Sequence, residues 1–374
     1  MHTPVIEHLE TRAKETASSE FIVWKDGQCL IEWPDARKLN IYSITKSLVS
    51  LAFGIAFDQG KLSNFDTSIS QYFPELKGTG KEAITIRHLL SHTSGIADPS
   101  GHQNDWEVMM EAPDLVKYVL SKAQAFAPGE RCYYSNRATS ILPTVLEHIT
   151  GVAFLDFVRK YLFDPMGIHD FVWKQDKVGH CFGSSEVEMS AKDLLKIGIM
   201  VLNRGLWEGK RIVSEKWLNL SGQNSSRLHP RMGLLWWKLP HAWASFDDPN
   251  FVVYWDKSLL EEYKKAGLPQ DMLDWIARHL DEEFTPAAMR KKLGHDLLKV
   301  FVGDFSMKAF DAMIPIYRVK AFAEYGVEAH GWFGQYLVIM PDKNLVAVRL
   351  CDDEGKDYDP KYFFSDLVEI LRRL

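Results

Sequence analysis

Ser43 and Lys46 stand three residues apart in the stretch 42–47, directly before the apolar segment 48–57. If this stretch is helical, residues three apart lie side by side, so the hydroxyl and the amine face the same point. On the first turn of that helix, Ser43 would also lie among the free N–H groups of the helix start. A serine is a weak nucleophile until a neighbouring base takes its proton. A lysine can be that base only where it is partly dehydrated. The pair therefore indicates a nucleophilic hydroxyl activated by an amine.

The segment 48–57 after this pair is apolar on nearly every face of a helix, which predicts that the helix is buried. Burial is the environment that such a lysine needs. The Ser-x-x-Lys pattern also occurs by chance, however, and Ser43 could simply cap a core helix. Other motifs must therefore decide between a catalytic and a capping serine.

The composition excludes several classes of protein. The 374 residues are 46% hydrophobic and 25% charged, as in an ordinary globular protein, and suffice for a large core in two packed lobes. The formal net charge is −6 without a long basic run, which argues against nucleic acid as a partner. No uncharged run approaches the roughly 20 apolar residues of a membrane span, so no membrane partner is expected.

The N-terminal residues and the cysteines predict a cytoplasmic protein. Residues 1–10 have neither the basic start nor the apolar core of a signal peptide. The four cysteines lie far apart and show no metal-type spacing, which is typical of reduced, scattered thiols. They are Cys29, Cys132, Cys181 and Cys351.

One pair among the 13 histidines, His88 and His92, has the four-residue spacing of two metal ligands on a helix. No acidic third ligand stands beside the pair. We therefore expect no metal and no other cofactor.

Apolar and β-branched runs predict strands near both ends of the chain, the first two joined by a hairpin turn at 25–28. The strands are expected at 21–24, 29–33, 334–340 and 345–350, and terminal helices at 5–18 and 362–374. The simplest architecture is an α+β fold. One antiparallel sheet from both chain ends is flanked by helices, and a mostly helical lobe is inserted.

Helical patterns fill the middle of the chain. The predicted helices are 85–96, 113–123, 138–151, 154–163, 194–202, 213–220, 257–266, 270–282 and 287–293, and a further strand is predicted at 232–237. We expect residues 1–80 and 225–374 to form the sheet lobe, with a helical excursion at 245–320. Residues 81–224 would form the helical lobe, and a catalytic groove would lie between the two lobes.

Three motifs in order make a recognisable pattern. They are Ser43-Ile44-Thr45-Lys46, Tyr134-Ser135-Asn136 and Ala329-His330-Gly331-Trp332, the last expected at the head of a strand. The pattern resembles the serine β-lactamase and penicillin-binding-protein superfamily. It is most similar to the class C β-lactamase-related esterases and amidases, which include the 6-aminohexanoate-dimer (nylon-oligomer) hydrolases. Residues 89–95, 190–194 and 334–336 also look like recurring segments of that family.

The resemblance implies a role for each motif residue. Ser43 would be the acylated nucleophile, with Lys46 and Tyr134 as the proton-transfer pair. Which of these two is the general base stays open. A free phenol has a pKa near 10, so a nearby ammonium would have to lower the pKa of Tyr134 before it could act as base. Asn136 would hydrogen-bond Lys46 and the substrate amide, and the backbone N–H groups of Ser43 and Trp332 would form the oxyanion hole.

The third motif departs from the family pattern, which has a lysine that helps to bind a substrate carboxylate. Ala329 stands at the lysine position in one register, and His330 in the other. The second register puts Trp332 where glycine is expected. We prefer the first, because Gly331 is then the small residue that lets the strand approach the substrate. In either register the fixed cation is missing or weakened.

These features together predict a serine hydrolase that acts through an acyl-enzyme on a small-molecule ester or amide. A β-lactamase or D-alanyl-D-alanine peptidase is the alternative enzyme, and a sensor that is acylated without turnover is the alternative of another class. Residues 245–320 are longer than expected for this family and could be a cover of the binding site or a solvated excursion. Trp236 and Trp237 could line the groove, although at least one should belong to the core.

Overall fold

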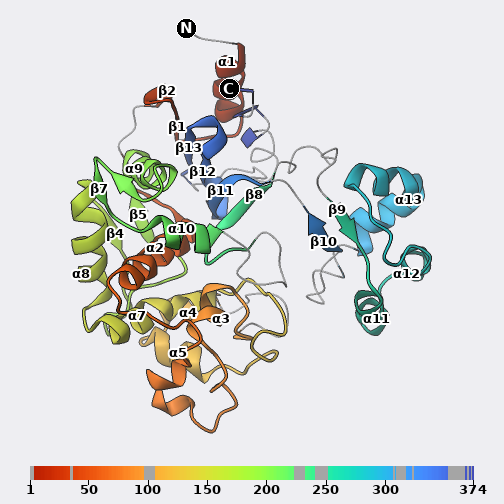
Figure 1. The fold of residues 1–374 in the computed structure, drawn as a ribbon, viewed down its shortest axis with the longest axis horizontal. Helices are drawn as coiled ribbons and strands as arrows, with labels where there is room; N and C mark the ends of the chain where they lie inside the picture. The colour runs from red at the N-terminus through yellow and green to blue at the C-terminus, as the bar shows by residue number, and fades with distance from the viewer. Residues whose placement is uncertain are drawn as a thin grey trace. The chain divides into compact units, whose positions relative to one another are not determined.

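The computed structural model contains two compact units (Figure 1). Met1–Ala97, Asp105–Leu239 and Tyr325–Leu374 form the larger unit, and Asp98–Asn104 with Pro240–Glu324 form the smaller one. The structure describes residues 4–33, 37–96, 106–222, 232–240, 252–305, 308, 317–321, 324–352, 367–368, 370–371 and 373–374.

A six-stranded sheet organises the larger unit. Its strands are β1 (Glu20–Lys25), β2 (Gln28–Glu32), β8 (Trp237–Pro240), β11 (Glu324–Gly331), β12 (Gln335–Met340) and β13 (Leu345–Leu350). They follow the order β2-β1-β13-β12-β11-β8 (Figure 1). The ladders β2-β1-β13-β12-β11 are antiparallel, so strands from the two ends of the chain pair directly. This confirms the predicted α+β fold with a sheet built from both termini.

Both faces of the sheet are covered. Phe21, Val23 and Ala347 belong to the core on one face, together with Leu9 of α1 (Pro4–Glu15) and the C-terminal Leu367. The alternate strand residues belong to the core on the other face, with α2 (Thr45–Asp58) and α9 (Ala191–Leu202). Two covered faces explain why the strand sequences are continuously apolar instead of alternating with polar residues.

Helix α2 is enclosed by the larger unit, since every residue from 45 to 56 is buried. Gly54 allows this packing, because a Cβ atom there would lie 2.4 Å from the ring of Trp217. The buried helix was predicted, but its start was placed too early. Ser43 belongs to a 3₁₀ turn, Tyr42–Ile44, that runs into α2, and the α-helix itself begins at Thr45.

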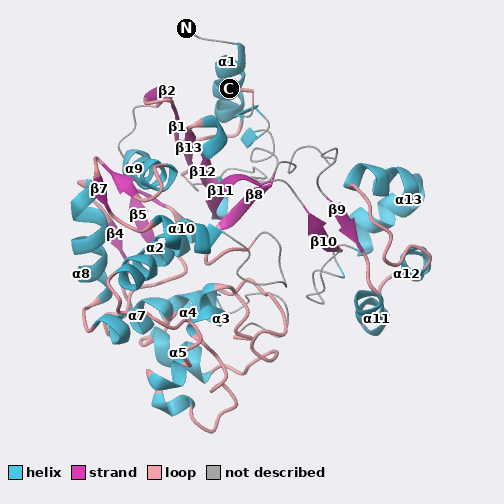
Figure 2. Ribbon diagram, in the orientation of Figure 1, coloured by secondary structure: helices cyan, strands magenta, loops and turns pink. Residues whose placement is uncertain are grey.

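The remaining elements of the larger unit are short (Figure 2). The helices are α3 (Ile86–Leu90), α4 (Trp106–Glu111), α5 (Leu115–Ser121), α6 (Asn136–Ser140), α7 (Leu142–Thr150), α8 (Phe154–Val158) and α10 (Glu215–Gly222). The strands are β3 (Leu39–Asn40), β4 (Val172–Trp173), β5 (Val187–Met189), β6 (Leu206–Trp207) and β7 (Lys210–Arg211).

Two helices and one strand of the larger unit differ from the predicted ones. The helix predicted at 138–151 is two helices, because Pro143 lacks an N–H group and its ring excludes the regular backbone turn before it. The helix predicted at 154–163 changes to a π-helical turn at Arg159–Phe163. The strand predicted at 232–237 begins only at Trp237, because Leu235 has a left-handed φ of 62° and Gly233 donates to the Trp236 carbonyl in a turn.

The smaller unit has its own core, which includes Trp255, Tyr263 and Phe305. Its elements are β9 (Val252–Tyr254), β10 (Arg318–Ala321), α11 (Lys257–Lys265), α12 (Gln270–Ala277) and α13 (Pro286–Val300). Residues 245–251, 306–307 and 309–316 of the predicted excursion lie outside the described residues, as do 362–366, 369 and 372 of the predicted closing helix. The division of the larger unit into a sheet lobe and a helical lobe stays a prediction.

In the described part of the chain, no single helix has both the length and the apolar character to cross a bilayer. The segments Asn136–Thr150 and Phe154–Met166 pass such a test only as a pair, and they are bent by 78° against each other.

Candidate active site

Ser43 and Lys46 meet as their spacing predicts. Lys46 Nζ lies 2.9 Å from Ser43 Oγ, and it also donates a hydrogen bond of 2.7 Å to the carbonyl oxygen of Ser184. Ser43 follows Tyr42, a non-glycine residue with a left-handed φ of 45°. The turn at Tyr42 orients the start of α2 so that the Ser43 hydroxyl lies next to the Lys46 amine.

Burial changes the protonation of the Lys46 amine. Only 3% of the residue is exposed, and the loss of water around the charged form lowers the pKa of Lys46 well below its ordinary value of 10.5. The amine therefore gives up its proton at a lower pH than a surface lysine does. A neutral amine with a lone pair can accept the proton of Ser43.

Tyr134 is the third group at this point. It shares a side-chain hydrogen bond with Ser43, and Lys46 Nζ lies 4.8 Å from the centre of its ring. Burial raises the pKa of Tyr134 to about 12, and the bond to Ser43 opposes this effect. A phenolate base would need a lowered pKa. The pKa of Tyr134 is raised instead, so its phenol keeps its proton at neutral pH.

Asn136 does not make the hydrogen bond to Lys46 that the sequence predicted. Its Oδ1 atom is buried without a hydrogen-bond partner among the described residues. Asn136 is the first residue of helix α6. Lys46 Nζ donates its hydrogen bond to the carbonyl oxygen of Ser184 instead. Nothing in the sequence pointed to Ser184, because a backbone acceptor leaves no side-chain signature.

The third motif lies at the end of strand β11, and not at the head of a strand as predicted, since the chain turns at Trp332–Gly334. Gly331 packs against the segment that carries Ser43. A Cβ atom at Gly331 would lie 2.4 Å from the Ile41 carbonyl oxygen and 3.1 Å from Ser43 N. The motif is therefore in contact with the backbone of Ser43, and this position requires glycine, in keeping with the register that puts Ala329 at the lysine position.

A pocket joins these residues. It is lined by Ser43, Lys46, Ser47, His92, Tyr134, Met232, Leu235, Trp237, Ala329 and His330. Trp237 lies at the pocket, whereas Trp236 is only 2% exposed and belongs to the core. The sequence analysis gave His92 no role in catalysis, and considered it as a metal ligand and as part of the family-like segment 89–95. Its Nδ1 atom instead accepts the Ser135 N–H at 3.1 Å, and His88 Nδ1 is part of the cap of α3.

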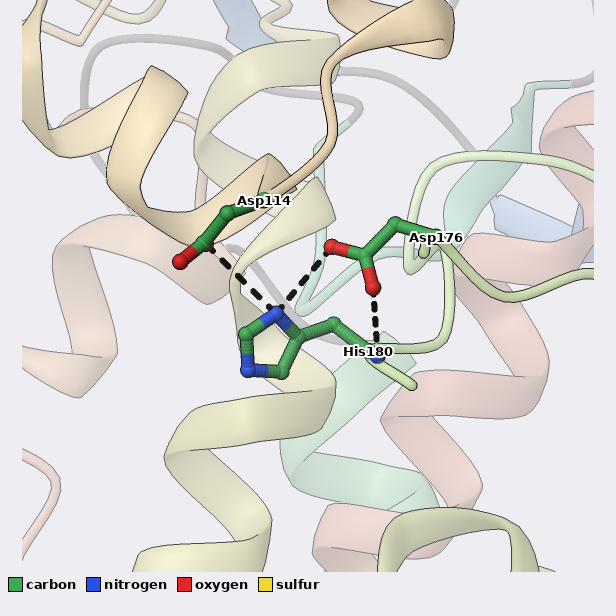
Figure 3. Close-up of side chains that lie close together, drawn as sticks. All are labelled: Asp114, Asp176 and His180. Carbon is green, nitrogen blue, oxygen red and sulfur yellow. Dashed lines mark hydrogen bonds and ion pairs between the residues drawn. The ribbon is translucent and has the colours of Figure 1, made fainter. Parts of the chain in front are cut away.

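A cluster with the composition of a metal site lies elsewhere in the larger unit (Figure 3). His180 Nδ1 is 3.1 Å from Asp176 Oδ2 and 3.7 Å from Asp114 Oδ1. Both oxygens of Asp176 already accept backbone N–H groups, from Leu115 at 2.7 Å and from His180 at 2.8 Å. The cluster therefore fixes the start of α5 to the loop 176–180.

The comparisons with known proteins agree with this geometry. A family model described as Beta-lactamase matches residues 7–367. The chain belongs to the beta-lactamase family. This confirms the resemblance that the three motifs indicated.

Relatives of this beta-lactamase-family chain include the 6-aminohexanoate-dimer hydrolase of Paenarthrobacter ureafaciens. It is 26% identical over 231 residues, which are 56% of this chain and 58% of that protein. Esterase EstB of Burkholderia gladioli is 30% identical over 147 residues, which are 35% of this chain and 37% of that protein. The chain thus spans less than two thirds of the length of these curated relatives. A penicillin binding protein from Bacillus halodurans shares the fold, with a TM-score of 0.60, 15% identity, and coverage of 97% of this chain and 100% of that one.

We expect Gly331→Ala to lower kcat/KM for a small ester by at least about 100-fold in this beta-lactamase-family chain. The added methyl would push β11 away from Ile41 and Ser43, and a displacement of about 1 Å at a reacting centre can cost that much. Ester hydrolysis by the purified variant measures the effect. Gly222→Ala is the matched control, because a Cβ there meets its nearest neighbour only at 3.4 Å. Equal activities of the two variants would contradict the close approach.

Proposed function

We propose that this protein is a serine hydrolase that cleaves small esters or amides through an acyl-enzyme on Ser43. The observation that carries the proposal is the 2.9 Å separation of Ser43 Oγ from a buried amine whose pKa is lowered. The hydrogen bond between Ser43 and Tyr134 adds a second proton carrier at the same oxygen. Membership of the beta-lactamase family and relatives named as a hydrolase and an esterase support this reading.

The pKa directions favour Lys46 over Tyr134 as the general base. Neutral Lys46 takes the proton of Ser43 while Oγ attacks the carbonyl carbon of the substrate. The phenol of Tyr134, which keeps its proton, then donates it to the leaving oxygen or nitrogen, and the Lys46 ammonium restores the phenol. Water then attacks the acyl-enzyme while the same groups act in the reverse order. Tyr134 takes the proton of water and passes its own proton to Lys46, and the Lys46 ammonium protonates Ser43 Oγ as the acid is released.

The tetrahedral intermediate needs hydrogen-bond donors for its oxyanion. We assign this role to the backbone N–H groups of Ser43 and Trp332. The close packing of Gly331 on Ser43 N supports the assignment, because it brings the end of β11 to the nucleophile. An oxyanion hole made of backbone N–H groups needs no particular side chain. It is therefore compatible with the altered third motif.

The wall of the pocket favours a neutral substrate. Ala329, which is 2% exposed, contributes a methyl group where related enzymes have a lysine, and the family resemblance assigns that lysine to a substrate carboxylate. A carboxylate buried there without a cation would be costly. Esters and simple amides without an adjacent carboxylate avoid this cost, so they are the proposed substrates, ahead of β-lactams and D-alanyl peptides.

We expect Ser43→Ala to abolish hydrolysis of p-nitrophenyl butyrate with the fold retained, since the alanine cannot form the ester intermediate. Intact mass after brief exposure to the ester should show one added butyryl group in wild type and none in the variant. A variant that keeps more than a tenth of the wild-type kcat/KM would exclude Ser43 as nucleophile. A stable adduct without turnover in wild type would favour the sensor reading.

We expect kcat/KM for the same ester to rise with pH along a limb whose midpoint lies well below 10.5. The base must be unprotonated, and burial lowers the pKa of Lys46, so activity is lost as the pH falls through that lowered value. A pH–rate profile measures the midpoint. His330→Gln is the control, because it removes the titratable ring at the pocket and should leave the midpoint in place. A midpoint at about 10 or above, the range of an unperturbed lysine, would contradict a desolvated base.

We expect kcat/KM for small neutral esters to exceed that for penicillins and cephalosporins by at least about 100-fold. This corresponds to one missing charge-assisted contact of roughly 3 kcal/mol. The ratio should shrink in Ala329→Lys and stay unchanged in Ala329→Met, which has a similar length without the charge. Cephalosporin turnover that matches ester turnover in wild type would instead identify a β-lactamase.

A further inference from the structure

His92 is held in the pocket in an unusual conformation. It follows helix α3, has a left-handed φ of 56° and is 1% exposed. The chain around it is well anchored, since Thr93 N donates to the His88 carbonyl at 2.8 Å and Gly129 N donates to the Thr93 carbonyl at 2.8 Å. Left-handed φ is an unfavourable backbone conformation for a residue other than glycine. This cost indicates that the position of the ring is determined by its surroundings.

The surroundings of His92 are the three consecutive residues centred on Tyr134. The His92 carbonyl oxygen accepts the Tyr133 N–H at 2.8 Å, and His92 Nδ1 accepts the Ser135 N–H at 3.1 Å. The imidazole ring stacks on the ring of Tyr134, with centroids 4.6 Å apart and an angle of 28° between the planes. One residue therefore fixes the backbone on both sides of Tyr134 and one face of its ring.

These contacts also determine the protonation of the imidazole. Because Nδ1 accepts a hydrogen bond from a backbone N–H, the ring proton resides on Nε2, and the ring is a neutral tautomer. A neutral ring can stack on a neutral phenol without adding charge beside Lys46, whose own charge is disfavoured by burial.

Tyr134 also has other ring neighbours. Trp237 lies 6.1 Å from Tyr134 with an angle of 23°, and His330 lies 5.5 Å from Trp237 with the same angle. Tyr134 thus belongs to a series of four stacked rings from four separate segments. Of the contacts described for these rings, only those of His92 also bind the backbone on both sides of Tyr134.

We propose that His92 is a positioning residue for the hydroxyl of Tyr134. This inference rests on the proposed function, in which Tyr134 returns a proton to the leaving group. A tyrosine ring turns about two side-chain bonds, and the transfer needs its hydroxyl at hydrogen-bonding distance from Ser43 Oγ. The two backbone hydrogen bonds that His92 accepts beside Tyr134, and its stacked imidazole ring, hold both side-chain bonds of Tyr134 in the required orientation. His92 itself does not touch the reacting atoms in this mechanism.

Two variants divide the function of His92 into its parts. His92→Phe keeps a stacking ring and removes the acceptor for Ser135 N–H. His92→Asn keeps an acceptor close to the Nδ1 position, suits the left-handed backbone and removes the ring. We expect His92→Phe to lower kcat for ethyl butyrate, whose alkoxide leaving group must be protonated, by at least about 30-fold. KM should change by less than about threefold, since the effect falls on proton transfer and not on binding. His92→Asn should retain more activity than His92→Phe.

The decisive measurement combines these variants with Tyr134→Phe, by single-turnover acylation of Ser43 followed by mass. If His92 acts through the Tyr134 hydroxyl, His92→Phe should have less than about a threefold effect once that hydroxyl is absent. An equal loss in both backgrounds would overturn the proposal, because a merely structural residue lowers activity whether or not the hydroxyl is present. If His92→Phe does not fold, the same cycle is measured with His92→Asn.

The controls separate failure of this inference from failure of the proposed function. His148→Phe replaces a histidine that also contacts aromatic rings, those of Tyr72 and Phe73, and should leave kcat unchanged. Full activity of Tyr134→Phe alone would overturn the role of Tyr134 in the proposed function. An impaired Tyr134→Phe together with a fully active His92→Phe would overturn only the role of His92.

Discussion

Dehydration of the Lys46 amine is the physical constraint on which the site depends. An ammonium on a surface helix would keep its proton and could not activate Ser43. The fold removes water from this position by enclosing α2, all of whose residues from 45 to 56 are buried. The sheet and α9 form one large core with α2, so the packing that stabilises the larger unit also lowers the pKa of Lys46. Core packing and the protonation of Lys46 are therefore coupled in this protein.

The backbone around the pocket is held in costly conformations. Tyr42, His92, Leu235 and Phe333 all have left-handed φ values between 45° and 62°, although none is glycine. Such conformations persist only where the surrounding structure determines them. At Phe333 the determining group is Arg349, which is fully buried and donates to the carbonyls of Phe333 and Gly334. Arg349 also donates to the Thr16 carbonyl and to Ser18 Oγ, at 2.6 Å each, so the turn after Trp332 is tied to the segment after α1.

The altered third motif connects the chemistry to the choice of substrate. Gly331 keeps the close approach of β11 to Ser43 on which the proposed oxyanion hole depends. Ala329, two residues earlier, faces the same pocket without a charge. The two functions that we propose for this strand in the family, holding the oxyanion and holding a substrate carboxylate, are separable, because backbone donors serve the first and a side chain serves the second. Retention of the first and loss of the second support our proposal of a neutral ester or amide substrate.

The sequence by itself determined the elements whose signals are local. The continuous apolar strands at both ends, the buried helix after Lys46 and the three-residue spacing of Ser43 and Lys46 all have the geometry expected of them. Tertiary structure alone decided the partners of these groups. The carbonyl of Ser184 replaces Asn136 at Lys46, and His92 binds the backbone on both sides of Tyr134. It also decided that burial raises the pKa of Tyr134 and lowers that of Lys46. The physical reason is that desolvation and backbone hydrogen bonds depend on which distant segments enclose a group, and residue types and spacing do not encode this locally.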